Sequence, residues 1–243
     1  MIERGVEVVV LAGGKGNRMG SFCYEKQKCL FPIDELPILY HIMDSLKEAF
    51  GTVSLKAVLS YKARKVKDYT ERNKPKNMGV DYFYDAGEGT YGAYKELEGF
   101  IKSPFFVGIP GDVIVLPETY LLVHEASLLR KLPAVLTFSP NIDEADTHAL
   151  GIVEDERVVK LAWPYENTKI NEEEQSVRHM NIYGFSQDVF SLMSSFVPGN
   201  GILTQSFMNS LDANITLGGL ISGNRWLHVA YKEDLDKRWL NGL

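Results

Sequence analysis

The sequence predicts an α/β fold with a doubly wound, mostly parallel sheet, and three observations indicate it. In the first 140 residues, short apolar runs rich in β-branched residues alternate with segments whose apolar residues recur at helical spacing. The links between these segments are short, which favours parallel strands joined by right-handed crossovers. After about residue 141 the expected strands follow one another more closely, which indicates a β-rich second part. We therefore expect one domain over residues 1–243, with a first half at 1–140 and a second half at 141–243.

The elements of the first half are predicted from their residue patterns. Residues 8–11 form an unbroken apolar, β-branched run, which is typical of a strand buried on both faces. Residues 38–50 carry apolar side chains at helical spacing, and Gly51 is expected to end that helix. Thr90 is expected to cap a helix that continues to residue 101. The other expected elements of this half are strands at 53–59, 80–84, 104–110 and 134–138, and helices at 61–73 and 118–130.

The second half is predicted to contain more strand than helix. Residues 150–153 and 157–163 are expected to form a hairpin that turns at 155–156. The polar segment around 172–174 is expected to be an exposed loop. The remaining expected elements are strands at 177–185 and 223–231, helices at 188–196 and around 207–211, and a closing helix through 235–240.

Composition excludes several classes of function. The formal net charge is −6, whereas a protein that binds the nucleic-acid backbone needs a basic face. Cys23 and Cys29 are the only cysteines, so neither a disulfide framework nor a zinc pattern is expected. We expect no signal peptide, and no apolar run in the sequence is long enough to span a membrane. We therefore expect a soluble, cytoplasmic protein without a membrane or nucleic-acid partner.

Glycines crowd the turn that follows the first expected strand. Gly13, Gly14 and Gly16 come directly after Leu11 and Ala12, where backbone N–H groups without nearby Cβ atoms form an anion-binding concavity. The turn matches neither G-x-x-x-x-G-K-[ST] nor G-x-G-x-x-G. From the residues alone, two interpretations remain open: a phosphate-binding loop served by the cations that follow it, or a tight strand-to-helix turn with those cations in solvent. The two cations are Arg18 and Lys28.

A single carboxylate stands at the end of another buried strand. Asp112 follows Gly111 just after the strand at 104–110, at the strand end where open α/β sheets bind ligands. The alternative is an aspartate that caps the next turn. We favour a ligand-binding carboxylate, because a buried strand and an earlier glycine loop lie around it in the same predicted half.

Three segments together resemble one known family. The segments are LAGGKGNRM at 11–19, KCLFPI at 28–33 and LPILYHIM at 36–43, and they are similar to the head of the nucleotide-sugar pyrophosphorylases, the sugar-1-phosphate nucleotidyltransferases. Gln27 stands where that family often has Pro or Ser. The interval from Arg18 to Lys28 is 28 − 18 = 10 residues, as in the sugar branch, whereas the sister branch of molybdenum-cofactor guanylyltransferases places its lysine sooner.

The resemblance implies a Rossmann-like nucleotidyltransferase fold and an enzyme that joins a nucleoside triphosphate to a sugar-1-phosphate, releasing pyrophosphate. It implies that Arg18 holds the leaving phosphates, Lys28 neutralises charge at the α-phosphate, and Asp112 binds Mg²⁺. The family also has a G-T-x-x-A loop that binds the nucleotide base and ribose. The residues expected to bind the nucleotide are Leu11, Ala12, Gly13, Gly14, Gly16, Gly89, Thr90 and Gly111.

The acceptor half resembles the family less closely. Gly151 matches its G-[VI]-[VI] hairpin, and Asn181 matches its asparagine-bearing strand, so both are expected to bind the sugar. The family hairpin ends in E-K-P, whereas this chain has Trp163 before a proline. We expect Trp163 to cover a sugar face, whereas the phosphate-binding charge is lost unless Lys160 or Lys169 replaces it.

His228 marks the second departure, because the family has W-x-D where this chain has WLH. Magnesium prefers oxygen ligands, and imidazole suits metals such as manganese better. We therefore expect His228 beside the metal, with Mg²⁺ as the cofactor and Mn²⁺ as the alternative.

Two other functions stay open at this point. A cytidylyltransferase for inositol phosphate or choline phosphate would share the head motifs and would not need E-K-P. A catalytically silent, nucleotide-sugar-sensing protein would keep the fold and lose metal ligands, although the presence of Arg18, Lys28 and Asp112 together favours an enzyme. The sequence leaves undetermined the base, the acceptor and whether the protein forms a homo-oligomer.

Overall fold

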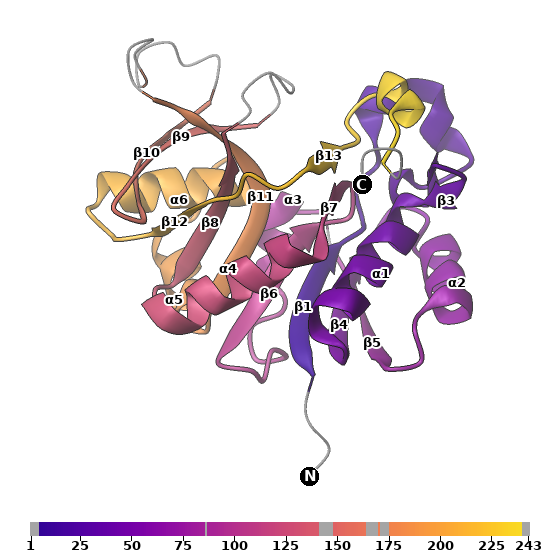
Figure 1. Ribbon diagram of the computed structural model, residues 1–243, viewed down its shortest axis with the longest axis horizontal. Coiled ribbons are helices and arrows are strands. Elements are labelled where there is room, and N and C mark those ends of the chain that lie inside the picture. The colour runs from indigo at the N-terminus through magenta and orange to yellow at the C-terminus, as the bar shows by residue number, and fades with distance from the viewer. Residues whose placement is uncertain (1–4, 86, 141–147, 164–169, 171–174, 240–243) are drawn as a thin grey trace. The chain divides into compact units, whose positions relative to one another are not determined.

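The computed structural model describes residues 5–85, 87–140, 148–163, 170 and 175–239 (Figure 1). The chain forms two compact units, each of which is assembled from separate segments. The first unit comprises Met1–Ala86, Ile109–Tyr120 and Arg225–Leu243, and the second comprises Gly87–Gly108 and Leu121–Asn224. The predicted halves were defined by the substrate that each is expected to bind, the nucleotide at 1–140 and the acceptor at 141–243, and not by contacts. That functional division stays a prediction.

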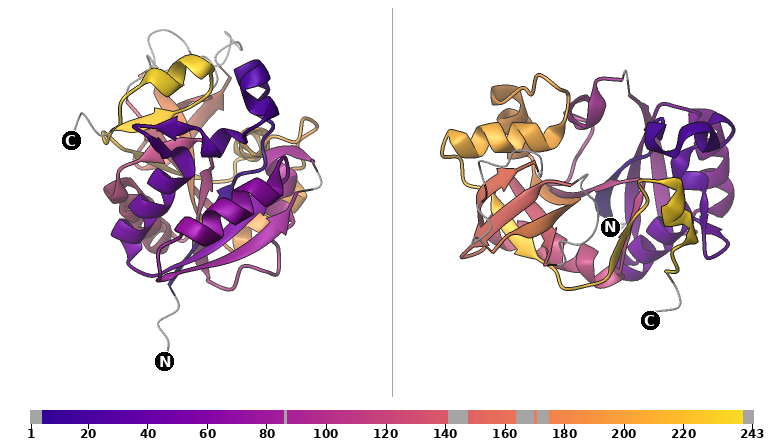
Figure 2. Two further views of the ribbon diagram at one scale, coloured as in Figure 1. Left: turned by 90° about the vertical axis from the view of Figure 1, so that its right-hand side faces the viewer. Right: turned by 90° about the horizontal axis from the view of Figure 1, so that it is seen from above.

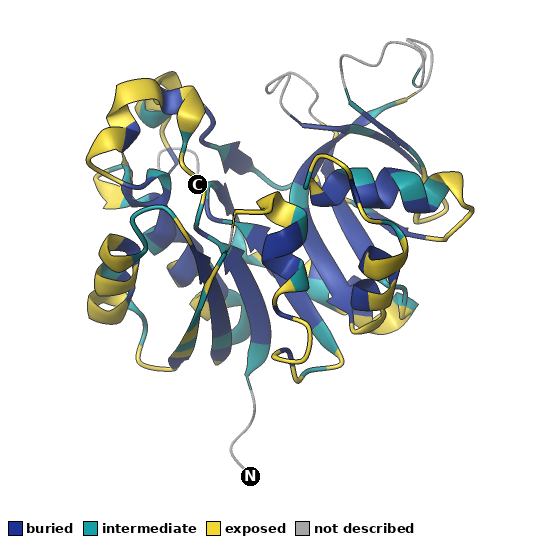
Figure 3. Ribbon diagram, turned by 180° about the vertical axis from the view of Figure 1, so that it is seen from behind, coloured by how far each residue is buried: buried dark blue, intermediate teal, exposed yellow. Residues whose placement is uncertain are grey.

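Three parallel strands form the sheet of the first unit. They are β1 (Val6–Leu11), β4 (Val53–Leu59) and β5 (Met78–Tyr84), and their order is β5-β4-β1. The register places Val8 opposite Leu55 and Val53 opposite Met78. The valines of β1 at positions 8–10 are fully buried, as the unbroken apolar run predicts. Figure 3 shows β1 and β4 as mostly buried, whereas most residues of β5 are intermediate or exposed.

Two helices complete the parallel crossovers of this unit (Figure 2). Helix α1 (Ile38–Phe50) has the predicted bounds, and Gly51 ends it with a left-handed φ of 66°. Helix α2 (Ala63–Asn73) begins two residues later than predicted, because Lys62 has a left-handed φ of 54°. Strand, helix and strand therefore alternate as the sequence predicts.

Several short elements surround this sheet. They are the 3₁₀ helices η1 (Asn17–Tyr24), η2 (Lys28–Leu30) and η3 (Lys232–Asp236), and the strands β2 (Pro32–Ile33), β3 (Leu36–Pro37), β7 (Val113–Val115) and β13 (Trp226–His228). Strand β7 pairs antiparallel with β13, and β2 pairs antiparallel with β3.

The predicted C-terminal elements are wrong in two respects. Strand β13 covers only three residues of the predicted 223–231, and the described part of the closing helix is the short η3. Side chains turn the backbone here: the Asp234 carboxylate accepts the Tyr231 N–H at 2.7 Å, and Asp34 accepts the Trp239 N–H at 2.6 Å. Such bonds compete with regular structure and are not visible in an apolar pattern. Residue 240 lies outside the described residues.

The second unit contains a mixed sheet. Its strands are β6 (Phe105–Pro110, of which Phe105–Gly108 belong here), β8 (Ala134–Ser139), β9 (Leu150–Glu154), β10 (Arg157–Ala162), β11 (Val177–Ser186) and β12 (Gly218–Ile221), in the order β6-β11-β8-β12-β10-β9. Strand β11 is antiparallel to β6 and β8, whereas β12 is parallel to β8. The sheet is therefore less parallel here than in the first unit.

Strand β12 was not predicted, because its glycines give little strand propensity. Gly219 is nevertheless required, since a Cβ atom there would lie 2.6 Å from Cγ1 of Val153. The hairpin of β9 and β10 is confirmed, and Asp155 and Glu156 at its turn have φ values of 44° and 61°. Two successive positive φ angles are typical of a type I′ hairpin turn.

The helices of this part are α3 (Gly89–Lys95), α4 (Pro117–Arg130), α5 (Asp188–Ser195) and α6 (Leu203–Asp212). Helix α4 begins in the first unit. The predicted cap at Thr90 is wrong: Thr90 lies inside α3, and its hydroxyl accepts the Leu203 N–H at 3.0 Å. Helix α3 also ends before the predicted residue 101, in turns that contain Gly99 with a φ of 80°. In the described part of the chain, no helix is long and apolar enough to cross a membrane.

Buried aromatic rings fill the core of the second unit. Phe185 lies 5.1 Å from Phe106 and 5.1 Å from Tyr183, measured between ring centroids. His179 lies in the same core, 5.2 Å from the rings of Phe138 and Tyr183. It is fully buried, and neither ring nitrogen has a hydrogen-bond partner within the described residues. Burial lowers the pKa of His179 to about 3.

We expect His179 to make the protein less stable in mild acid. Unfolding returns its pKa to about 6.5, so below that pH the unfolded chain binds a proton that the folded chain excludes. Between pH 7 and pH 5 this should cost about 2 kcal/mol of unfolding free energy. Urea unfolding at several pH values should show that His179→Phe removes this part of the pH dependence. Equal pH slopes for the variant and the wild type would contradict the expectation.

Candidate functional site

A glycine loop leads from β1 into η1 in the first unit. Gly16 has a left-handed φ of 67°, and a Cβ atom on it would lie 2.5 Å from Sγ of Cys23. A Cβ atom on Gly13 would lie 2.9 Å from Cβ of Ser60. Glycine is therefore required at both positions by backbone conformation or by close approach.

The carbonyl groups of this loop are used inside the protein, whereas its N–H groups are not. The Gly13 carbonyl accepts the Tyr61 N–H at 3.1 Å, and the carbonyls of Ala12 and Gly14 accept bonds from the Gln27 side chain. Within the residues that the structure describes, no acceptor is bonded to the N–H groups of residues 13–16. Successive unbonded N–H groups in a tight loop are suited to bind an anion.

The backbone next to Asp112 is hydrogen-bonded to the end of β1, where this loop begins. The Gly111 N–H donates to the Leu11 carbonyl at 2.8 Å, so the residue before Asp112 is fixed to the end of β1. A Cβ atom on Gly111 would lie 2.8 Å from that same carbonyl oxygen, which explains the glycine. The Val229 N–H donates to the Asp112 carbonyl at 2.9 Å. The backbone on both sides of Asp112 is therefore anchored.

Two basic side chains meet the Asp112 carboxylate. Lys28 Nζ forms an ion pair with Asp112 Oδ2, and both side chains are mostly buried, with exposures of 15% and 21%. His228 Nε2 lies 3.6 Å from the same oxygen. His228 reaches this position because β13 pairs with β7, which places it opposite Val113. The structure therefore brings together three site residues that the sequence analysis selected separately.

The charges of this cluster keep Asp112 ionised. Burial by itself raises the pKa of the carboxyl group, but Lys28 and the hydrogen bond from His228 outweigh burial and hold the pKa well below its usual range. The cluster therefore presents a carboxylate at neutral pH. It is a small group of charged side chains beside a loop whose N–H groups are suited to bind an anion.

Arg18 is the remaining cation that the sequence analysis selected. It lies in η1, and its exposed side chain has no ion pair or hydrogen bond to a described residue. Its guanidinium is therefore available to a ligand. The described residues contain no group of three His, Cys, Asp or Glu side chains placed to hold a metal ion. Any metal bound by Asp112 and His228 needs further ligands from elsewhere.

The other candidate residues lie in the second unit, where most have structural partners. Trp163 Nε1 donates to Gln205 Oε1 at 3.2 Å. The Asn181 side chain accepts the Tyr183 hydroxyl at 3.2 Å and lies 3.0 Å from His148 Nδ1. A Cβ atom on Gly151 would collide with the ring of Phe138. Lys169 and the proline after Trp163 lie outside the described residues.

Gly89 and Thr90 form a contact with the segment that precedes α6. Gly89 has a left-handed φ of 73°, and the Gly201 carbonyl is so close that a Cβ atom would collide with it. The Tyr91 N–H donates to that carbonyl at 3.0 Å. The backbone conformation and this close contact therefore explain why residue 89 is glycine, without any role in nucleotide binding.

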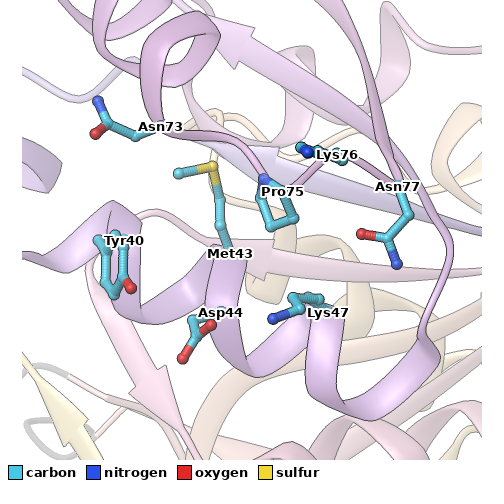
Figure 4. A pocket seen from close by; sticks show the side chains of 8 residues that line it. All are labelled: Tyr40, Met43, Asp44, Lys47, Asn73, Pro75, Lys76 and Asn77. Carbon is cyan, nitrogen blue, oxygen red and sulfur yellow. The ribbon is translucent and has the colours of Figure 1, made fainter.

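The first unit also has a pocket of about 380 Å³ away from these residues (Figure 4). Asp44 and Lys47 of α1 lie on one side of it, and Asn73 and Asn77 lie on the other. Among the described residues that line it, none belongs to the candidate site. We therefore assign it no part in the site.

Residues 8–149 match the family model described as the MobA-like NTP transferase domain. The chain belongs to this family. The match contains the glycine loop, Arg18, Lys28 and Asp112, and it excludes His228. The family therefore covers the larger part of the site described above.

Two curated relatives illustrate what the chain is similar to. It is 25% identical to the bifunctional protein GlmU of Methanococcus maripaludis (strain C7) over 97% of this chain and 55% of that protein. It is 27% identical to the D-glycero-alpha-D-manno-heptose 1-phosphate guanylyltransferase of Campylobacter jejuni over 76% of this chain and 78% of that protein. The chain thus spans about half the length of the GlmU proteins it matches.

Solved structures share the fold. A UDP-glucose pyrophosphorylase complexed with UDP-glucose has a TM-score of 0.78 at 16% identity and covers 95% of each chain. The inositol-1-phosphate CTP transferase from T. maritima has a TM-score of 0.75 at 18% identity, covering 95% of this chain and 91% of that chain. These likenesses confirm the predicted nucleotidyltransferase fold, and at such low identity they show the fold alone.

Sequence reasoning found Lys28, Asp112 and His228 from motif positions, but it did not assign a role to Gln27. The Gln27 side chain bonds to two carbonyls of the glycine loop. The available signal was its departure from the Pro or Ser of the resembling family. An unusual residue at a motif position shows that the position differs from the family, but it does not indicate which groups its side chain contacts.

Proposed function

We propose that this protein transfers a nucleotidyl group from a nucleoside triphosphate to a sugar-1-phosphate and releases pyrophosphate. The observation that supports this best is the ionised Lys28–Asp112 pair, with His228, behind a loop of unbonded N–H groups. Membership of the NTP transferase family supplies the type of reaction. The heptose 1-phosphate guanylyltransferase among the relatives supports a sugar-1-phosphate as acceptor.

In this reaction a phosphate oxygen of the sugar-1-phosphate attacks the α-phosphorus of the nucleotide. A new P–O bond forms, the bond to the β-phosphate oxygen breaks, and pyrophosphate leaves with the bonding electrons. The protein forms no covalent intermediate, so it acts by positioning and by charge stabilisation. We assign the N–H groups of residues 13–16 and the free Arg18 to the leaving phosphates, and Lys28 to the α-phosphate.

Asp112 and His228 fit a divalent ion as a pair of neighbouring ligands. His228 Nε2 lies 3.6 Å from Asp112 Oδ2, so the two side chains could contact the same ion. The carboxylate suits Mg²⁺, and the imidazole suits Mn²⁺ better. When bound, the ion would neutralise phosphate charge, with substrate oxygens and water as its other ligands.

The proposal extends to the second unit through the family resemblance. Gly89 and Thr90 are assigned to the nucleotide, and Gly151, Trp163 and Asn181 to the acceptor. The protein is also proposed to work in the cytoplasm, as a monomer or a homo-oligomer. These assignments rest on motif positions, since the contacts of these residues have structural explanations of their own.

A second candidate is a cytidylyltransferase whose acceptor is a phosphate other than a sugar phosphate. Two observations favour it. The chain has Ala162 and Trp163 where the resembling family has an acid and a lysine. The fold is also shared with an inositol-1-phosphate CTP transferase. A catalytically silent sensor of nucleotide sugars is the alternative outside enzymes.

The deciding experiment measures pyrophosphate release by the purified protein with each common nucleoside triphosphate. The acceptors are a panel of sugar-1-phosphates together with inositol phosphate and choline phosphate. Release with a sugar-1-phosphate supports the first proposal, and release only with CTP and a non-sugar phosphate supports the second. Silence with every pair, together with tight binding of a finished nucleotide sugar, overturns both in favour of the sensor.

The same assay tests the assignment of His228. A role of His228 as a metal ligand predicts that wild-type turnover is higher with Mn²⁺ than with Mg²⁺, because imidazole binds Mn²⁺ more favourably. His228→Asp should reverse that preference, since it restores an oxygen ligand. The measured quantity is the ratio of kcat/KM with the two metals, and an unchanged ratio in the variant would exclude His228 as a ligand.

A further inference from the structure

The side chain of Gln27 connects three backbone groups of the candidate site. Its Nε2 donates to the Ala12 carbonyl at 2.9 Å and to the Gly14 carbonyl at 3.1 Å. Its Oε1 accepts the Cys29 N–H at 2.5 Å. Gln27 is 2% exposed, so water cannot readily replace these bonds. The opposite amide orientation would place Nε2 against an N–H and Oε1 against two carbonyls, so the bonding pattern allows one orientation only.

These bonds determine which way the glycine loop faces. In a trans peptide the C=O and the next N–H point in opposite directions. Because Gln27 draws the carbonyls of Ala12 and Gly14 toward itself, the N–H groups of Gly13 and Lys15 point away from Gln27. Within the described residues these N–H groups have no acceptor in the protein. Gln27 therefore supports the conformation that leaves them available to an anion.

The same side chain also positions Lys28. By accepting the Cys29 N–H, Gln27 caps the 3₁₀ helix η2, whose first residue is Lys28. The Leu30 N–H donates to the Gln27 carbonyl at 3.0 Å and closes this turn. One amide thus joins the loop that carries the N–H groups to the turn that carries the lysine.

Proline or serine at this position could not make the same contacts. A proline side chain has no polar group, and a serine hydroxyl is too short to replace an amide that spans the loop and the turn. The backbone of Gln27 has φ −71° and ψ 145°, which proline also adopts. The connection is therefore made by the side chain and does not depend on an unusual backbone.

We propose that Gln27 is a positioning residue that keeps the N–H groups of the glycine loop directed toward a pyrophosphate group and couples that loop to Lys28. The proposal rests on the proposed function for the identity of the anion. When a loop is already ordered in its binding conformation, the free-energy cost of ordering it on anion binding is smaller. Gln27 would thus act on phosphate affinity through the loop, without touching the substrate itself.

The test compares pyrophosphate binding, measured by calorimetry, in the wild type and in Gln27→Met. Methionine has a similar length and is apolar, so the volume is kept and the three bonds are lost. We expect the dissociation constant for pyrophosphate to rise about tenfold or more. In turnover assays we expect KM for the nucleotide to rise more than kcat falls.

Thr70→Val is the matched control. Thr70 is also buried in the first unit, and its hydroxyl donates to the Val66 carbonyl at 2.9 Å inside α2. It should lower the melting temperature and leave pyrophosphate affinity unchanged. If Gln27→Met weakens pyrophosphate binding no more than Thr70→Val does, the role proposed for Gln27 is overturned.

Gln27→Pro is a second variant, which is used if the Gln27→Met protein does not fold. Proline fits the observed φ and removes the same side-chain bonds, so it should weaken pyrophosphate binding as well. Wild-type affinity in this variant would also overturn the proposal.

The measurements also separate the role of Gln27 from the proposed enzymatic function. If the wild type binds pyrophosphate without turnover and Gln27→Met does not bind it, the proposed enzymatic function is contradicted while the role of Gln27 stands. If the wild type binds no pyrophosphate, both fail.

Discussion

Asp112→Asn is expected to reduce pyrophosphate release by about 1,000-fold or more while leaving the fold intact. Asparagine keeps the shape of the side chain and removes its negative charge. That charge is the partner of Lys28 and the proposed oxygen ligand of the divalent ion. A 1,000-fold loss corresponds to roughly 4 kcal/mol of transition-state stabilisation, which is within the range for a metal-binding charge.

The control for Asp112→Asn is Asp81→Asn. Asp81 also belongs to the first unit and pairs with a lysine, with Asp81 Oδ2 lying 2.6 Å from Lys56 Nζ. Its side chain is 64% exposed and lies outside the candidate site, so its loss should leave turnover nearly unchanged. Circular dichroism and thermal melting would verify the fold of both variants. Wild-type turnover in Asp112→Asn would contradict the assignment of Asp112 as the central residue of the proposed site.

Lys28→Met is expected to lower kcat by about 100-fold to 1,000-fold. The ammonium group of Lys28 is mostly buried, and a charge in such a place acts more strongly on a phosphate than one in water. Lys26→Met is the matched control, because Lys26 is two residues away and exposed. Steady-state kinetics should show little change for Lys26→Met. Equal effects of the two variants would indicate a general charge effect and not a site.

The double variant of Lys28 and Asp112 gives a further check on this pair. Two residues that act as a unit show non-additive losses. We therefore expect the double variant to be about as slow as the slower single variant. A loss equal to the product of the two single effects would mean that Lys28 and Asp112 contribute independently.

Local pattern was sufficient for elements whose cause is local. The apolar run of β1 predicted a strand buried on both faces, and helix α1 ends at Gly51 as expected. The hairpin turn at Asp155 and Glu156 was also predicted correctly. In each case the residues that determine the element lie within it or at its end.

Elements that depend on distant partners were predicted less well. Thr90 does not cap its helix because its hydroxyl bonds to Leu203, which is 113 positions away in the sequence. Strand β12 pairs with β8 and β10, and its Gly219 lies so close to Val153 that a Cβ atom would not fit. Asp34 holds the backbone at Trp239, where a helix had been expected. A periodic pattern contains no information about such partners.

The α/β class and the glycine loop could be predicted from local patterns, and short motifs together with the family resemblance selected Arg18, Lys28 and Asp112 as candidate site residues. Which of these side chains lie in contact depends on the folded chain. Lys28 and Asp112 are 84 positions apart, and His228 joins them through the pairing of β13 with β7. The three bonds of Gln27 were likewise invisible, since a side-chain amide takes its partners from whatever backbone the fold places beside it.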